Sequence, residues 1–191
     1  MSKQRLRLRS QGIVAIVVVF ALIFGLVALF GGMLSRTERP ELAGEAAYRA
    51  RLAATPQDFQ TLVNLGNLHY DRGQYAEAIT YYEQALALNP DDVNVLVDTG
   101  TAYFYRQPSD PDRALAYYQR ALERAPTFPN ALYNKGIVLW QGKGDLLAAR
   151  RAFEEFLRVQ PSGPNAAAAR QIIEEIDRNL PLAGKGSGSK N

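Results

Sequence analysis

Apolar and small residues between Phe59 and Pro161 recur in one pattern that is written three times. Each copy holds a glycine, an alanine, an aromatic residue and a proline in the same order. These positions are Gly66, Ala78, Tyr82 and Pro90 in the first copy, Gly100, Ala114, Tyr118 and Pro126 in the second, and Gly136, Ala149, Phe153 and Pro161 in the third. Successive copies are 34 to 36 residues apart, and a period of this length is typical of stacked two-helix units.

The residue types explain how such a unit would fold. Glycine and alanine let two helices approach closely, and the aromatic side chain fills the space between them. The residue before a proline disfavours helical geometry, so each second helix should end there. We therefore expect three units, at 59–92, 93–128 and 129–161, with the helices of the first near 59–71 and 75–88. In the second unit, Asp110 is placed to cap the helix that follows a loop at 107–111.

This pattern resembles the tetratricopeptide repeat (TPR) family, whose signature has small, aromatic and proline positions in the same phase. The resemblance implies an all-α solenoid in which the first helices of successive units line a concave groove. Two positions depart from the signature. Its first aromatic residue is leucine here, and its tyrosine, kept as Tyr103 in the second unit, becomes His69 in the first and Leu139 in the third. His69 is the only histidine, and we expect it to pack inside a helix pair.

The segments flanking the three units read as caps. Residues 41–58 echo the second helix of a unit and are predicted to be a degenerate N-terminal half repeat that covers the first unit. Residues 162–182 are predicted to be a C-terminal capping helix with an apolar face at Ile172, Ile173, Ile176 and Leu180. The last stretch, 183–191, is rich in Gly, Ser and Lys and is expected to be a disordered tail.

Residues 12–34 carry no charge and are mostly Ile, Val, Leu, Phe and Ala. About 20 apolar residues suffice to cross a bilayer as a helix, and no cleavage site of the signal-peptide type follows. The sequence therefore predicts one transmembrane helix before the solenoid, joined to it by a linker at 35–40. Because the basic residues precede the helix, residues 1–11 would be a cytoplasmic tail and the repeats extracytoplasmic, periplasmic in a Gram-negative cell.

Small residues at 21, 25, 28 and 32 form a stripe on one face of this predicted helix. Such stripes let membrane helices pack, which suggests a homo-oligomer. Ordinary membrane composition explains the stripe equally well.

Charge and composition exclude several classes of function. The net charge of +3 arises from four basic residues before residue 10; without them, 18 basic residues face 19 acidic ones. A nucleic-acid partner thus loses its electrostatic basis. The chain has no cysteine, no metal-ligand spacing, and no phosphate loop at Gly142-x-Gly144. Adjacent carboxylates such as Glu154 and Glu155 point in different directions on a helix. We expect no enzyme activity, no catalytic residue, no metal and no cofactor.

The candidate binding surface follows from the resemblance, by mapping the family's groove positions onto this chain. We call these fifteen residues the predicted groove. They are Val63, Asn64, Asn67, Tyr70 and Asp71 in the first unit, Val97, Asp98, Thr101, Phe104 and Tyr105 in the second, and Asn130, Tyr133, Asn134, Ile137 and Trp140 in the third. Amides can bond a peptide backbone, and aromatic side chains offer large contact areas. Some of these residues, Phe104 and Trp140 among them, could equally serve only to pack the units together.

Family members that grip a C-terminal carboxylate use Lys and Arg beside Asn in this groove. Asn67 fits that scheme, but Val63, Asp98, Asn130 and Asn134 do not, so a carboxylate clamp is not expected. The predicted function is a membrane-anchored adaptor or scaffold whose groove binds a peptide or helix of another envelope protein.

Two alternatives stay open. The segment 51–58, the longer second turn and the bulky Phe156 look like the periplasmic repeat domain of cytochrome c maturation proteins, which implies a role in cytochrome c biogenesis with apocytochrome or haem lyase partners. The second alternative is a self-associating structural assembly protein.

Overall fold

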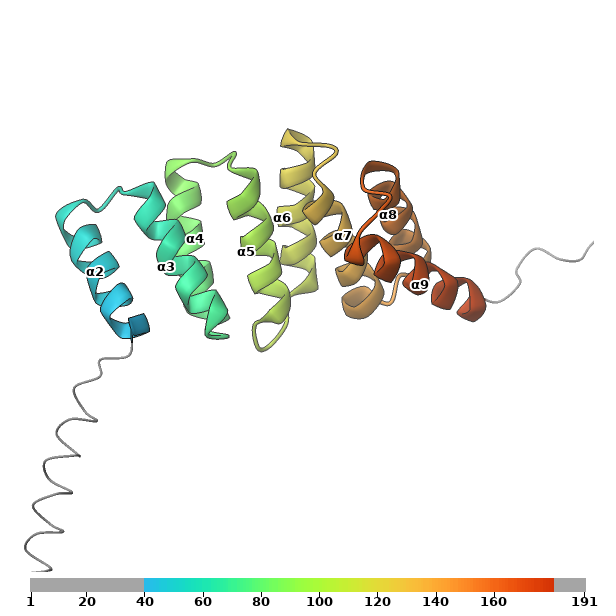
Figure 1. Cartoon of the computed structure of the whole chain (residues 1–191), viewed down its shortest axis with the longest axis horizontal. Helices are drawn as coiled ribbons and strands as arrows, with labels where there is room; N and C mark the ends of the chain where they lie inside the picture. The colour runs from blue at the N-terminus through green and yellow to red at the C-terminus, as the bar shows by residue number, and fades with distance from the viewer. Residues whose placement is uncertain (1–39, 181–191) are drawn as a thin grey trace, which may run out of the picture. The chain divides into compact units, whose positions relative to one another are not determined.

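The computed structural model describes residues 40–180, with side chains from residue 44 onward, and every regular element in that range is helical (Figure 1). The elements in chain order are α2 (Pro40–Ala54), α3 (Phe59–Asp71), α4 (Tyr75–Leu88), α5 (Val93–Tyr105), α6 (Pro111–Arg124), α7 (Pro129–Ile137), the π-helical turn η1 (Val138–Lys143), α8 (Leu146–Val159) and α9 (Pro164–Asn179). The helices predicted at 59–71 and 75–88 coincide with α3 and α4.

Aspartate side chains fix where four of these helices begin. Each accepts a hydrogen bond from a backbone N–H of the first turn, a group that would otherwise lack a partner inside the helix. The pairs are Asp58 with Thr61, Asp92 with Val95, Asp110 with Arg113 and Asp145 with Ala148. Asp110 is therefore the cap that its position after the 107–111 loop predicts.

The second helices end where the proline pattern places their ends. Asn89, Ala125 and Gln160 are the C-terminal caps of α4, α6 and α8, and a proline follows each of them. The residue before a proline is pushed into extended geometry, and all three caps have left the helical region, with φ between -136 and -129 and ψ between 84 and 88.

The repeated glycines bring the two helices of each unit into contact. A Cβ atom at Gly100 would lie 2.8 Å from Cε1 of Tyr118, and one at Gly136 would lie 2.7 Å from Cε1 of Phe153. Gly66 faces Tyr82 in the same way. Tyr82, Tyr118 and Phe153 are at most 1% exposed, so each ring occupies the volume that a larger residue would need.

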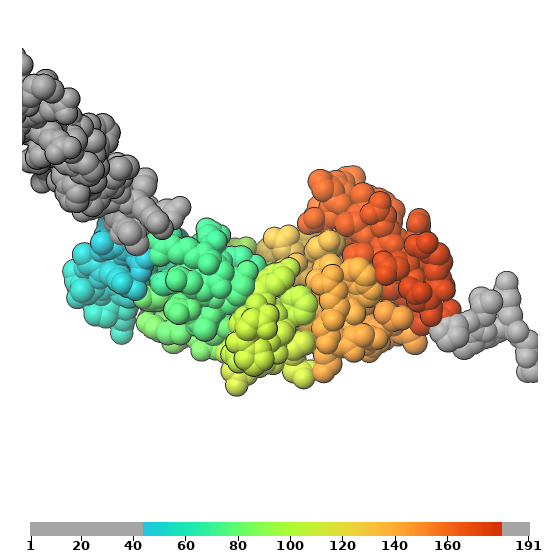
Figure 2. Space-filling view, turned by 90° about the horizontal axis from the view of Figure 1, so that it is seen from below, coloured from blue at the N-terminus to red at the C-terminus, as the bar shows by residue number. Residues whose placement is uncertain are grey.

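From Tyr48 onward the helices form one compact unit in which each packs on its neighbours in the chain. Figure 2 shows this succession on the surface, where the colours follow chain order. One buried cluster is built from α3 to α7, and a second from α7, α8 and α9. Leu122 packs against both, which joins the two cores. Ile172 and Ile176 of α9 lie in the second cluster, as expected of a terminal helix that covers the last unit.

Two predictions about membranes need correction. Within residues 40–180, no helix is both long and apolar enough to cross a lipid bilayer. The longest of them, α9, has 16 residues, fewer than the about 20 that a span requires. The predicted fold class with a transmembrane helix and the predicted single-pass location are thereby overturned and are not carried further. Residues 12–34, on which both rested, lie outside the described part of the chain, as do 1–11, 35–39 and 183–191.

Candidate functional site

The first helices of the second and third units enclose a pocket, which we call the α5–α7 pocket. Helices α5 and α7 contact each other directly, and η1 extends α7 along the same side. The pocket has a volume of about 190 Å³ and is lined by Thr101, Phe104, Tyr105, Tyr118, Tyr133, Asn134, Ile137, Val138 and Gln141. Six of these nine residues belong to the predicted groove. Four aromatic rings, two aliphatic side chains, two amides and one threonine hydroxyl from two successive units therefore face a common space.

Hydrogen bonds around Thr101 hold the polar side of this pocket in place. Thr101 Oγ1 donates to the carbonyl oxygen of Val97 at 2.8 Å and accepts from Asn134 Nδ2 at 3.2 Å. Because the threonine proton is used in the first bond, the Tyr118 hydroxyl, 3.1 Å away, donates to the same oxygen. Side chains from α5, α6 and α7 thus meet at one atom, which fixes the orientation of the Asn134 amide.

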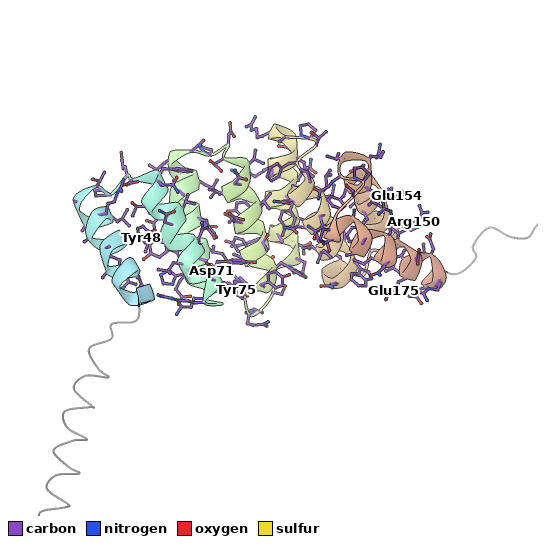
Figure 3. All side chains as sticks on the ribbon, viewed as in Figure 1. Tyr48, Asp71, Tyr75, Arg150, Glu154 and Glu175 are labelled. Carbon is purple, nitrogen blue, oxygen red and sulfur yellow. The ribbon has the colours of Figure 1, made fainter. Side chains whose placement is uncertain are left out.

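Aromatic rings continue from the pocket toward the first unit. Phe104 lies 5.3 Å from Tyr105, Tyr105 lies 5.8 Å from Tyr75, and Tyr75 lies 5.2 Å from Tyr70, measured between ring centroids. Figure 3 marks Tyr75 beside Asp71, at the turn between α3 and α4. The Tyr105 side chain is 46% exposed although it belongs to this row. A large aromatic surface is therefore open to solvent next to the pocket.

Asp98 lies one helical turn before Thr101 on α5 and is only partly exposed. Within residues 40–180, no hydrogen bond or ion pair joins its carboxylate to another side chain. Burial, and secondarily the negative charge of Asp92, raise its pKa from the ordinary 3.8 to about 6. The same carboxylate raises the pKa values of Tyr70, Tyr82 and Tyr118, after the larger effect of burial on each. These three rings come from α3, α4 and α6, so the negative charge of Asp98 raises the pKa values of phenol groups on three other helices.

The remaining residues of the predicted groove are distributed differently. Val97 is buried at 4% exposure and is unavailable to a ligand. Val63 and Tyr70 pack against the first core cluster, and Trp140 packs against the second rather than lining the α5–α7 pocket. Asn67 accepts a hydrogen bond from the Tyr82 hydroxyl at 2.8 Å, and Asn64 accepts one from Gln60 at 3.0 Å. Asn130 and Asp71 are exposed.

Three lining residues were not predicted, namely Tyr118, Val138 and Gln141. Tyr118 was assigned only to filling the space between helices, although its hydroxyl is a signal that one edge of the ring meets polar groups. Val138 and Gln141 belong to the π-helical turn η1, which follows α7 and which the repeat pattern does not predict.

His69 and the acidic side chains are the described residues that bear on chemistry other than binding. His69 is buried and stacks on Tyr81 at 5.3 Å, with Nδ1 2.7 Å from Gln74 Oε1, so it packs inside the helix pair as expected. Among the described residues, no group of three or more His, Asp or Glu side chains could hold a metal ion.

Comparisons with known proteins agree with the repeat pattern. Two tetratricopeptide repeat family models match residues 57–127 and 102–174. The photosystem I assembly protein Ycf3 of a Synechococcus strain is 41% identical over 68 residues, which are 35% of this chain and 39% of that protein. Tetratricopeptide repeat protein 8 of Caenorhabditis elegans is 24% identical over 110 residues, 58% of this chain and 21% of that one. The chain thus spans well under half the length of these curated relatives.

Solved structures share the fold. A crystal structure of MamA superposes with a TM-score of 0.62 and 23% identity, over 77% of this chain and 82% of that one. The first TPR domain of Spaghetti (RPAP3), bound to the HSP90 peptide SRMEEVD, superposes with a TM-score of 0.59 and 21% identity, over 65% and 94%. Repeat period, capped helix pairs and family matches all agree, and the chain belongs to the tetratricopeptide repeat family.

Proposed function

We propose that this protein is an adaptor that binds an extended peptide or a helix of another protein in the α5–α7 pocket and along the adjoining aromatic row. Membership of the TPR family supports the general role in protein–protein interaction. The observation that carries the proposal is the pocket itself, which is open, aromatic and formed by residues of two successive units. Its about 190 Å³ is smaller than the about 300 to 1,000 Å³ of typical small-molecule sites, so a single side chain of a partner fits it better than a cofactor does.

The names of two similar proteins also support a role in binding other proteins, but neither identifies a partner of this chain. The Spaghetti domain holds a peptide of HSP90, and Ycf3 is named for the assembly of photosystem I. The likeness to cytochrome c maturation proteins and self-association stay predictions, since no contact among the described residues favours either.

The test is a selection of peptides on the full chain. A random library of 12-residue peptides is displayed and enriched on the wild-type protein, and the affinities of selected synthetic peptides are then measured by fluorescence anisotropy. Tyr105→Ala removes an exposed aromatic side chain beside the pocket, so the fold should persist. Aromatic residues at the centre of an interface commonly contribute about 2 kcal/mol or more, and each 1.4 kcal/mol is tenfold in affinity. We expect Tyr105→Ala and Tyr133→Ala to weaken binding at least about tenfold.

The matched control is Leu147→Ala on α8. Leu147 is 55% exposed and does not line the pocket, so this variant should bind the selected peptides as the wild type does. Peptides that ignore both tyrosine variants, or a selection that enriches none, would refute the proposed site.

A further inference from the structure

The structure assigns a chemical preference to this site: we propose that the partner segment carries a lysine or arginine whose cation pairs with Asp98, two positions from an apolar residue that enters the α5–α7 pocket. This inference rests on the proposed function, because it specifies which peptide the groove selects. Four observations support it, namely the unpaired carboxylate, the absence of basic residues from α3 and α5, the aromatic row and the spacing to the pocket.

The Asp98 carboxylate lacks the partner that a partly buried charge normally has. Removing a charge from water is unfavourable unless an opposite charge or hydrogen-bond donors replace the water. Glu83, on the adjacent helix α4, accepts hydrogen bonds from the hydroxyls of Tyr103 and Tyr117 at 2.7 and 3.0 Å. Asp98 accepts none from any described residue. A cation supplied by a second molecule would satisfy it.

The chain supplies no such cation from the neighbouring first helix or from its own. Helices α3 and α5 contain neither lysine nor arginine, whereas Asp71 and Asp98 are acidic. The charge of Asp92, on the same helix, raises the pKa of Asp98, and the charge of Asp98 raises the pKa values of three tyrosines. These are Tyr70 on α3, Tyr82 on α4 and Tyr118 on α6. All are neutral or negative at neutral pH. This part of the surface is therefore complementary to a positive charge.

The aromatic row adds a second feature that favours a cation. Lysine and arginine bind over the faces of tyrosine rings as well as beside carboxylates. The ring centroids of Tyr70 and Tyr75 are 5.2 Å apart, those of Tyr75 and Tyr105 are 5.8 Å apart, and Tyr105 is exposed. The methylene groups of a long basic side chain can lie along such rings while its charged end reaches a carboxylate.

Spacing links the charge to the pocket. Thr101 follows Asp98 by three residues, so the two lie on one helix face about 4.5 Å apart along the axis. In an extended peptide, alternate side chains point the same way and are about 7 Å apart. The difference of about 2.5 Å is within the reach of a long, flexible basic side chain, so a basic residue over Asp98 and an apolar residue two positions away can be engaged at once.

The inference also distinguishes this chain from its structural neighbour. The peptide bound by the Spaghetti domain, SRMEEVD, contains three acidic residues, and its arginine has a glutamate, not an apolar residue, two positions away. A carboxylate at position 98 would repel an acidic segment lying over it. We therefore expect SRMEEVD itself to be a poor ligand of this protein.

The experiment uses the peptides selected on the full wild-type chain. We expect lysine or arginine at one fixed position relative to an apolar residue, and a selection on Asp98→Asn should lose that enrichment. Asn has the shape of Asp without its charge and removes an unfavourable charge, so this variant should fold. For one selected peptide, replacing its basic residue by methionine should weaken binding to the wild type about tenfold or more. The same replacement should change binding to Asp98→Asn less than twofold.

Each outcome decides between the two proposals. Peptides that depend on Tyr105 and Tyr133 but lack a basic residue, or whose lysine contributes equally to wild type and Asp98→Asn, overturn the Asp98 pairing and leave the groove intact. Peptides that ignore both tyrosines overturn the groove and the pairing with it. Lysines at 185 and 190 allow a further outcome: tighter peptide binding after deletion of 181–191 would show that the chain's own end occupies the site, which overturns an external partner.

Discussion

Glu83 and Asp98 lie on adjacent helices, α4 and α5, yet their surroundings differ in kind. The Glu83 side chain accepts from two tyrosine hydroxyls, and Arg113 Nη1 donates to one of these, Tyr103, at 3.0 Å. The guanidinium groups of Arg106 and Arg113 also lie 5.4 and 5.2 Å from the centroid of the Tyr103 ring. We call Glu83, Tyr103, Arg113 and Tyr117 the tyrosine–glutamate network.

The difference shows which of the two carboxylates can bind another molecule. In the tyrosine–glutamate network, hydrogen-bonding groups are matched within the chain, so a ligand would have to break bonds to form its own. At Asp98 the charge is desolvated and has no partner among the described residues. The network therefore stabilises the fold, whereas Asp98 weakens it and is available to another molecule.

The largest effect is expected from displacing the ring that holds the helices of the first unit together. Valine at position 66 would overlap the Tyr82 ring, which is 1% exposed and cannot move without disturbing the core. Overpacking of this kind costs about 1 to 3 kcal/mol and occasionally more. We expect Gly66→Val to lower the free energy of unfolding by about 3 kcal/mol in urea denaturation. The Tyr82 hydroxyl would also lose its hydrogen bond to Asn67.

The control for this variant is Ala87→Val, which places the same side chain at an exposed position of α4. It should cost no more than about 0.7 kcal/mol, the range of ordinary helix propensities. Equal losses in the two variants would mean that helix propensity, and not the contact with Tyr82, determines the result.

The second-largest expected effect is an increase in the free energy of unfolding, and it depends on pH. Because the pKa of Asp98 is about 6 in the folded protein and 3.8 ordinarily, the folded state binds more protons than the unfolded state between these values. The free energy of unfolding should therefore fall as pH rises from about 4 to about 6 and stay low above that. One pKa unit corresponds to about 1.4 kcal/mol. Since Asp98 is partly solvated, we expect Asp98→Asn to stabilise the protein by about 2 kcal/mol at pH 7.5.

The measurement is urea denaturation of both proteins at pH 4 and pH 7.5. The advantage of Asp98→Asn should be large at pH 7.5 and nearly vanish at pH 4, where the wild-type carboxyl is protonated. An advantage that does not change with pH would show that the carboxylate is solvated in the folded state, and the contrast with Glu83 would then fail.

Removing the hydroxyl at the centre of the tyrosine–glutamate network should destabilise the fold. Tyr103→Phe deletes the donor to Glu83 and the acceptor of Arg113 while keeping the ring, which is 3% exposed. Hydrogen bonds to charged groups contribute about 1.5 to 3 kcal/mol, and partial exposure of Glu83 lowers this. We expect a loss of about 1.5 kcal/mol in thermal and urea denaturation. Tyr105→Phe, which removes a hydroxyl from an exposed ring of the same helix, should stay within about 0.5 kcal/mol.

The residue types along the chain predicted the helix pairs of the fold more completely than they predicted the residues that line the site. Gly100 allows two helices to approach closely, the Tyr118 ring fills the space between them, and Pro126 lacks the N–H that would continue the helix. These effects are local, so the spacing of the three residues sufficed to predict a helix pair. The site depends on how helices of different units face each other. Trp140 packs against the second core cluster while Gln141 lines the pocket, and burial makes Val97 unavailable although it occupies a predicted groove position. Nothing in the order of residues gives the desolvation of Asp98, because it depends on how other helices pack around α5.

The smallest effect tests whether burial, and not the mere presence of a partner, separates the two carboxylates. Arg124 Nε lies 2.8 Å from Asp91 Oδ1, and the two side chains are 56% and 58% exposed. This pair is as short as the hydrogen bonds of the tyrosine–glutamate network, but water surrounds it. Exposed ion pairs contribute about 0 to 1 kcal/mol because solvent screens them. We therefore expect Arg124→Ala to change the free energy of unfolding by less than about 0.5 kcal/mol, with no further change in 0.5 M NaCl. A loss as large as that of Tyr103→Phe would show that pairing alone determines the contribution of a charge here, and the low exposure of Asp98 would then no longer explain why it behaves differently from Glu83.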